Sequence, residues 1–221
     1  MRALFPRLRE VIKAVNATHP AWESVSLQTI ADAIQTHEPI NEIIRLPCDI
    51  DTEIIVGKYA EVISESGSRV GIIVHRKYDE NDPFRDPLYP MIRFGIAKEM
   101  MHVFDSEQEK TRQHQVAVDL MESLLDKELW DGKRPDYFAD KRAIYGAIEL
   151  LVRFEIRVVM ANGLIVTQAR STNDWSYVGK QFRVPDWVAA IAFNQHYIEY
   201  IKSHRESAKI VDHDFYVTCG N

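Results

Sequence analysis

The spacing of apolar residues changes twice along this 221-residue chain. Apolar residues recur at helical spacing over residues 4–37, give way to runs rich in isoleucine and valine over residues 40–76, and return to helical spacing over residues 91–207. A helix buries one stripe and a strand buries one face, so each spacing predicts its own kind of element. The order of the three regions predicts an α+β fold, with a small antiparallel sheet packed on a mainly helical body.

Capping and helix-breaking residues set the bounds of the expected helices. The first is expected over residues 4–18, and the second begins at the N-cap residue Ser26 and ends near His37. Residues 164–183 are ambiguous, and residues 164–167 fit a short strand. Further helices are expected over residues 91–104, 107–129, 136–161 and 185–207.

Three strands are expected in the sheet region, over residues 40–46, 53–64 and 69–76. Residues 65–68 carry a turn signal, so the second and third strands should form an antiparallel hairpin. Residues 77–90 contain three prolines and few aliphatic residues, and we expect them to form a loop before the next helix.

Length and composition fit one globular domain over residues 1–221, because 46% of the residues are hydrophobic and 27% are charged. The net charge of −6 disfavours binding to a phosphate backbone, so no nucleic-acid partner is expected. Cys48 and Cys219 form no C-x-x-C pair, which fits reduced thiols in the cytoplasm. Residues 1–15 lack the apolar core of a signal peptide, and no apolar run is long enough for a membrane span. We therefore expect a soluble cytoplasmic protein.

The residues best suited to chemistry lie in the helix expected over residues 91–104. In a zincin helix, the pattern H-E-x-x-H places two histidines on one face to bind Zn²⁺, and the glutamate activates the bound water. Here the pattern is K-E-x-x-H. Glu99 has the position of the general base and His102 that of the second metal ligand. Lys98 replaces the first ligand, and a protonated lysine has no lone pair for a metal.

The surroundings of this motif resemble the ImmA/IrrE family of zinc metallopeptidases, regulators that cleave transcriptional repressors. The run Arg93-Phe94-Gly95-Ile96-Ala97 is similar to the R-F-T-x-A that precedes H-E-x-x-H in that family. The resemblance covers about residues 70–155 and implies a zincin-like fold. Residues of a later helix match the family pattern E-x-E-A-N-x-F-A-x-E-L-L: Ala143, Ala147, Glu149, Leu150 and Leu151.

The departures from the family pattern agree with one another. The family's third metal ligand is the glutamate before the first alanine of that later helix, and this chain has Arg142 there. Lys98 and Arg142 thus place cations at two ligand positions, so we expect no bound cofactor. An ion-pair cluster is expected instead, in which Arg142 or Lys98 pairs with Glu99 and His102 is hydrogen-bonded alongside. If a metal is bound, the expected ligands are His102 and Asp140.

Three functions are compatible with these residues. The first is a catalytically degenerate zincin-like protein, not an enzyme, that binds a protein or peptide as a regulatory domain. The second is an active hydrolase, with either a metal-free acid/base pair of Glu99 and Lys98 or zinc in a rearranged site. The third is a plain interaction protein in which the motif is coincidental. The rearranged site would combine His102 with one of three residues: Asp140, His114 or Glu149.

Overall fold

The computed structural model describes residues 4–18, 24–48, 57–64, 67–75, 89–105, 135–203 and 205. It has the predicted α+β class, with a small sheet and many helices. The chain forms two compact units, Met1–Leu151 and Val152–Asn221, where the sequence predicted a single domain. The sheet and the residues of the K-E-x-x-H motif belong to the first unit.

Two N-terminal helices have the bounds that the sequence predicted. Helix α2 (Leu27–His37) is capped by Ser26, whose Oγ accepts a hydrogen bond from the Thr29 amide at 3.0 Å. This cap satisfies one of the amides left without a partner at the start of a helix. Helix α1 (Leu4–Thr18) buries the apolar stripe that its spacing predicted: Leu8, Val11, Ile12 and Val15.

The sheet contains β1 (Ile40–Cys48), β2 (Gly57–Ser64) and β3 (Gly67–His75), in the order β1-β3-β2. The predicted antiparallel hairpin of β2 and β3 is confirmed. The prediction of an antiparallel sheet is wrong for the other pair, because β1 runs parallel to β3. Apolar alternation predicts where strands lie but not which strand is central. Here β3 is central, and its residues Val70 and Ile72 are fully buried.

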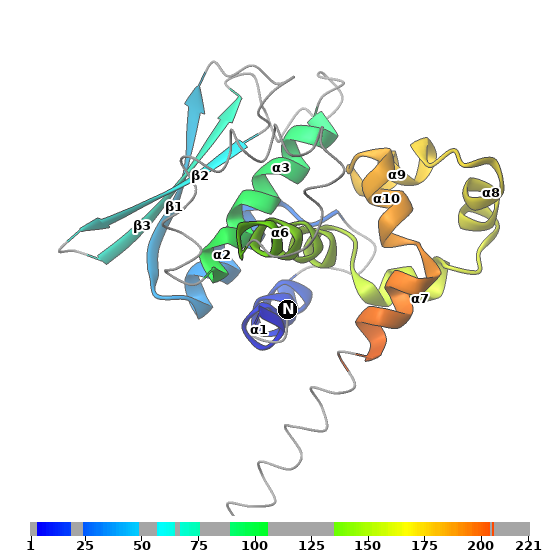
Figure 1. Cartoon of the computed structure of the whole chain (residues 1–221), viewed down its shortest axis with the longest axis horizontal. Helices are drawn as coiled ribbons and strands as arrows, with labels where there is room; N and C mark the ends of the chain where they lie inside the picture. Colours follow the sequence, from blue (N-terminus) through cyan, green and yellow to red (C-terminus); the bar gives the residue numbers. More distant parts are fainter. Residues whose placement is uncertain are drawn as a thin grey trace, which may run out of the picture. The chain divides into compact units, whose positions relative to one another are not determined.

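Helix α3 (Tyr89–Met101) is the central helix of the first unit and is followed by a short 3₁₀ helix, η1 (His102–Phe104). It packs against β2 and β3 on one side and against helix α6 (Pro135–Leu151) on the other (Figure 1). Most of its side chains are buried, including polar ones. Polar residues on this helix are therefore removed from water and need partners within the protein.

The second unit contains short helices where the sequence predicted longer ones. The helix predicted over residues 136–161 is interrupted at residues 152–153, between α6 and α7 (Phe154–Met160). The break has no proline or glycine to mark it in the sequence. The predicted stop near Gly163 is confirmed, because the Gly163 amide donates to the Met160 carbonyl at 2.8 Å in a turn that ends α7.

The rest of the second unit corrects two further predictions. The short strand considered for residues 164–167 is the start of helix α8 (Leu164–Thr172), whose Val166 and Ala169 face the core. The helix predicted over residues 185–207 is broken at Asn194, whose side chain accepts from the Tyr197 amide at 3.2 Å and caps a new helix over residues 195–203. Two more helices complete the described part of this unit: α9 (Ser176–Phe182) and α10 (Asp186–Ala192).

Some predicted segments lie outside the described residues: the hairpin turn at 65–66, the loop as far as residue 88, the helix over 107–129 with His114, and the tail from residue 208. Asp140 lies in α6, but its side chain is outside the described part. No helix within the described ranges combines the length and the apolar character needed to cross a membrane.

Candidate functional site

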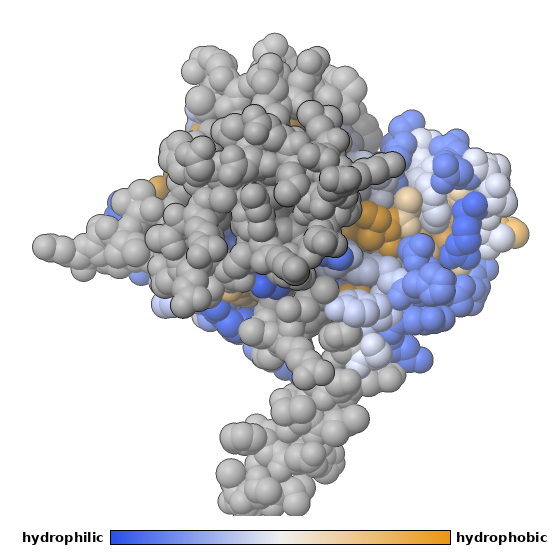
Figure 2. All heavy atoms as spheres, viewed as in Figure 1, coloured by the Kyte–Doolittle hydropathy of each residue, from blue (hydrophilic) through white to orange (hydrophobic). Residues whose placement is uncertain are grey.

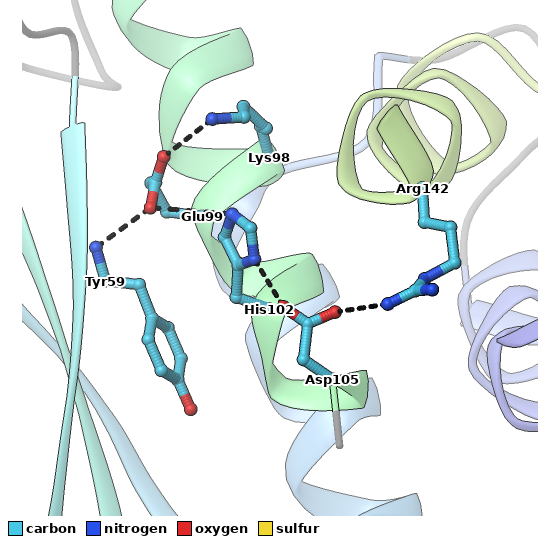
Figure 3. A network of polar contacts seen from close by, with 6 residues as sticks. All are labelled: Tyr59, Lys98, Glu99, His102, Asp105 and Arg142. Atoms are coloured by element: carbon cyan, nitrogen blue, oxygen red, sulfur yellow. Dashed lines mark hydrogen bonds and ion pairs between the residues drawn. The ribbon is translucent and has the colours of Figure 1, made fainter. Parts of the chain in front are cut away.

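The residues singled out by the motif come together at the C-terminal end of α3. Glu99 and His102 are three residues apart and share a face of the helix, with His102 Nε2 4.0 Å from Glu99 Oε2 (Figure 3). Lys98 precedes them and turns its ammonium toward the same carboxylate. All of these residues belong to the first unit of the chain.

The carboxylate of Glu99 has a partner on each oxygen. Lys98 Nζ donates to Oε1 at 3.2 Å, and the backbone amide of Tyr59 donates to Oε2 at 2.9 Å. Tyr59 lies on β2, so this second bond ties the strand to helix α3. Glu99 is only 8% exposed, and a carboxylate this buried is stable as a charge only when it is bonded in this way.

His102 is held from its other side by Asp105, which follows η1. Its Nδ1 lies 2.6 Å from Asp105 Oδ2, and the Asp105 amide donates to the His102 carbonyl at 3.1 Å. The ring therefore has a carboxylate on each side, with Asp105 at Nδ1 and Glu99 at Nε2. The ring of Tyr59 packs against this imidazole, with the two centroids 6.0 Å apart.

Arg142 on α6 completes the arrangement. Its guanidinium donates to Asp105 Oδ1 at 3.3 Å, so the two oxygens of Asp105 serve two different partners. We call the resulting chain of contacts the polar network: Lys98, Glu99, His102, Asp105 and Arg142. Each of its carboxylates is paired with a cation, Glu99 with Lys98 and Asp105 with Arg142, as burial requires.

The arrangement agrees with the sequence prediction in one pair and differs in another. Lys98 pairs with Glu99, as the hypothesis of an ion-pair cluster allowed. Arg142, the other expected partner of Glu99, binds Asp105 instead. Asp105 was not predicted, although its position three residues after His102 places the two side chains close together. The contribution of Tyr59 comes from its backbone, for which no sequence signal exists.

The described residues do not fit a zinc ion. Lys98 and Arg142, the cations that the resemblance aligns with two metal ligands, are each paired with a carboxylate, and neither side chain has a lone pair to donate. In the part of the chain that the structure describes, no three His, Cys, Asp or Glu side chains are grouped so as to hold a metal. Glu149, a candidate for a rearranged site, is a buried residue of α6.

Two kinds of chemistry remain open to the polar network. As a set of ion pairs, it fastens β2, α3 and α6 to one another through Tyr59, Asp105 and Arg142. As an acid/base site, it offers the imidazole of His102, oriented by a carboxylate in the manner of a general base. His102 is only 6% exposed, so the structural role needs no rearrangement whereas the catalytic one needs a substrate to reach the ring.

Comparison with known proteins does not place the chain in a family. No protein-family model matches it, and neither curated proteins nor solved structures give a significant match. The likeness to the ImmA/IrrE peptidases therefore rests on the motif residues and their spacing.

Proposed function

We propose that this protein is a zincin-like domain in which an ion-paired network has replaced the metal site, and that it acts as a non-catalytic, regulatory binding domain for a protein or peptide. The observation that carries the proposal is the contact of 3.2 Å between Lys98 Nζ and Glu99 Oε1. In this contact the lysine ammonium neutralises the carboxylate that would otherwise activate a metal-bound water. A cytoplasmic location belongs to this proposal, because Cys48 and Cys219 form no C-x-x-C pair and fit reduced thiols.

The surroundings of Glu99 oppose its use as a general base. A base must have an oxygen available to the proton that it removes. Both oxygens of Glu99 already accept hydrogen bonds, one from Lys98 and one from the Tyr59 amide. Moving the carboxylate to a substrate would break the link between β2 and α3. The geometry thus favours a fixed scaffold over a catalytic centre.

An extended peptide is the ligand class that the described sheet fits best. Among the described strands, β1 has β3 on one side only, and its residues 43–47 range from half-buried to exposed. A strand with one partner can accept a second through main-chain hydrogen bonds. The start of β1 is less accessible, because Gln35 donates to the Asn41 carbonyl at 3.1 Å. We place the peptide beside the second half of β1.

The proposal is tested by panning a displayed library of random peptides against the full chain. Enriched peptides would then be synthesised and titrated by calorimetry, and each would be examined by mass spectrometry after prolonged incubation with the protein. We expect binding without cleavage, and slowed amide exchange at residues 43–46 in the complex, since Pro47 has no amide proton. Cleaved peptides would refute the non-catalytic role, protection elsewhere would refute the placement on β1, and a library without binders would refute peptide binding.

A metal-free hydrolase is the second candidate, and the contact of 2.6 Å between His102 and Asp105 is the observation that favours it. A carboxylate-oriented imidazole can take a proton from water without a metal. The same incubation separates the two candidates, provided that it is repeated with a chelator and with His102→Ala. Chelator-resistant cleavage that disappears in the variant would establish the hydrolase.

A further inference from the structure

One of the two longest stretches of the chain without Asp, Glu, Lys or Arg covers residues 158–169 and lies far from the polar network in sequence. It contains the end of α7, the turn at 161–163 and most of α8. An uncharged stretch of this kind normally lies in a core. Here only part of it does, because Val166 and Ala169 are buried whereas the residues around the turn are not.

Four aliphatic side chains around this turn face solvent. Leu164 is 89% exposed and Val159 is 80% exposed. Val158 and Ile165 complete the group, which we call the aliphatic patch, and each is exposed by nearly half. Figure 2 shows hydrophobic surface among hydrophilic residues over the helices of this unit. A single exposed aliphatic residue is ordinary, but four that are close in sequence indicate a contact surface.

Local structure keeps the patch together and exposed. The hydrogen bond of 2.8 Å between the Gly163 amide and the Met160 carbonyl closes the turn, so Val159 and Leu164 flank it on either side. The burial of Val166 fixes which side of α8 faces inward. Leu164 therefore cannot turn into the core without displacing Val166 from it. The exposure is thus a consequence of how this unit folds.

Charge at the rim of the patch indicates what can cover it. Glu155, one turn before the patch, pairs with Arg205 at 2.7 Å. On the other side Arg170 donates to the carbonyls of Phe193 at 3.1 Å and Ala161 at 3.5 Å. One anion and two cations thus lie near the patch, and each of them is engaged within its own chain.

We propose that the aliphatic patch is the contact surface of a homodimer. A twofold interface places a surface against its own copy, so any net charge there repels itself. The chain as a whole carries −6, yet residues 158–169 carry no charge, so two copies can meet on this surface without charge repulsion within it. A lipid surface is a poorer match, because residues 158–169 contain no lysine, arginine or aromatic residue to anchor them at headgroups.

The test is sedimentation velocity of the full chain over about a hundredfold range of concentration, since dimerisation follows mass action. We expect a dimer for the wild type and a monomer for Leu164→Glu. Tyr177→Glu is the matched control: Tyr177 is an apolar residue of α9, 62% exposed and outside the patch, and this variant should remain dimeric. A wild type that is monomeric throughout, or a Leu164→Glu variant that remains dimeric, would overturn the proposal.

A charge-pairing experiment makes the result independent of any single variant. Val159→Lys and Val159→Glu should each be monomeric alone, and a mixture of the two should form a mixed dimer that falls apart at high salt. Failure of the mixture to associate would count against the patch as a self-contact. Flotation with neutral phosphatidylcholine vesicles completes the set. Monomeric wild type that floats, combined with Leu164→Glu that does not, would assign the patch to a membrane and overturn the dimer.

Discussion

Nδ1 of His102 lies 2.6 Å from Oδ2 of Asp105, and Oδ1 of the same carboxylate accepts a hydrogen bond from Arg142. Asp105 therefore joins the end of α3 to α6 through two side chains that the sequence motif had assigned to a metal site. The same geometry orients the imidazole so that Nε2 is directed toward Glu99. The contacts that His102 and Arg142 make within the polar network therefore depend on this one unpredicted residue.

Replacing Asp105 should destabilise the first unit. Asp105→Ala leaves the buried His102 and the half-buried Arg142 without their shared carboxylate, and breaking a buried ion pair costs about 3 kcal/mol or more. Asp105→Asn keeps one oxygen as an acceptor and should cost less. Urea unfolding followed by circular dichroism measures the difference. An Asp105→Ala variant within about 0.5 kcal/mol of wild type would show that the network contributes little.

Glu99 should control how firmly β2 is held to α3. Glu99→Ala removes the acceptor of the Tyr59 amide, and a buried donor left without a partner costs about 1–3 kcal/mol. Glu99→Gln retains an oxygen at that position, so it serves as the matched control. Amide hydrogen exchange at Tyr59 should be fast in Glu99→Ala and slow in Glu99→Gln. Equal exchange rates at Tyr59 in the two variants would show that the Glu99 carboxylate does not hold β2 to α3.

Glu155 should make stability in the second unit depend on pH. Burial raises the pKa of its carboxyl, but the hydrogen bond and charge of Arg205 outweigh burial and hold the pKa below 4.5. Because the folded pKa is lowered, the stabilisation is present above the unfolded value of about 4.3 and is lost as pH falls through the folded pKa. The side chain is 53% exposed, so the effect should stay below about 1 kcal/mol.

The variant Glu155→Gln measures this effect. Its stability should be slightly lower than that of wild type near neutral pH, and the two should converge below about pH 4, where both side chains are uncharged. Urea unfolding at a series of pH values gives the comparison. A difference that stays constant on acidification would mean that the lost charge is not its cause.

The sequence predicts elements well where local chemistry decides them. Ser26 caps α2 with its own side chain, and the β2–β3 hairpin joins neighbouring strands across a short turn. The parallel direction of β1 escaped prediction, because it depends on which strand occupies the centre of the sheet. Leu164 begins a helix although its neighbours favour a strand, since packing of Val166 and Ala169 outweighs a weak local preference.

The candidate site was predictable to a similar extent. Glu99 and Lys98 lie at the end of α3 and His102 begins η1 directly after it, so spacing along one short segment brings their side chains together. The partner of Arg142 was not predictable, because it depends on where α6 lies against the end of α3, a distance of 37 residues along the chain. A main-chain donor such as the Tyr59 amide cannot be predicted from the residue pattern, because almost every residue type has a backbone amide.

The zinc content of the full chain after dialysis against zinc tests the central claim most directly. We expect wild type to retain no stoichiometric zinc, because Lys98 and Arg142 supply charge where a metal needs lone pairs. The double variant Lys98→His with Arg142→Glu, checked for folding by circular dichroism, should gain zinc, and Lys98→His alone should gain less. One zinc ion per chain in the wild type would contradict the replacement of the metal site by ion pairs.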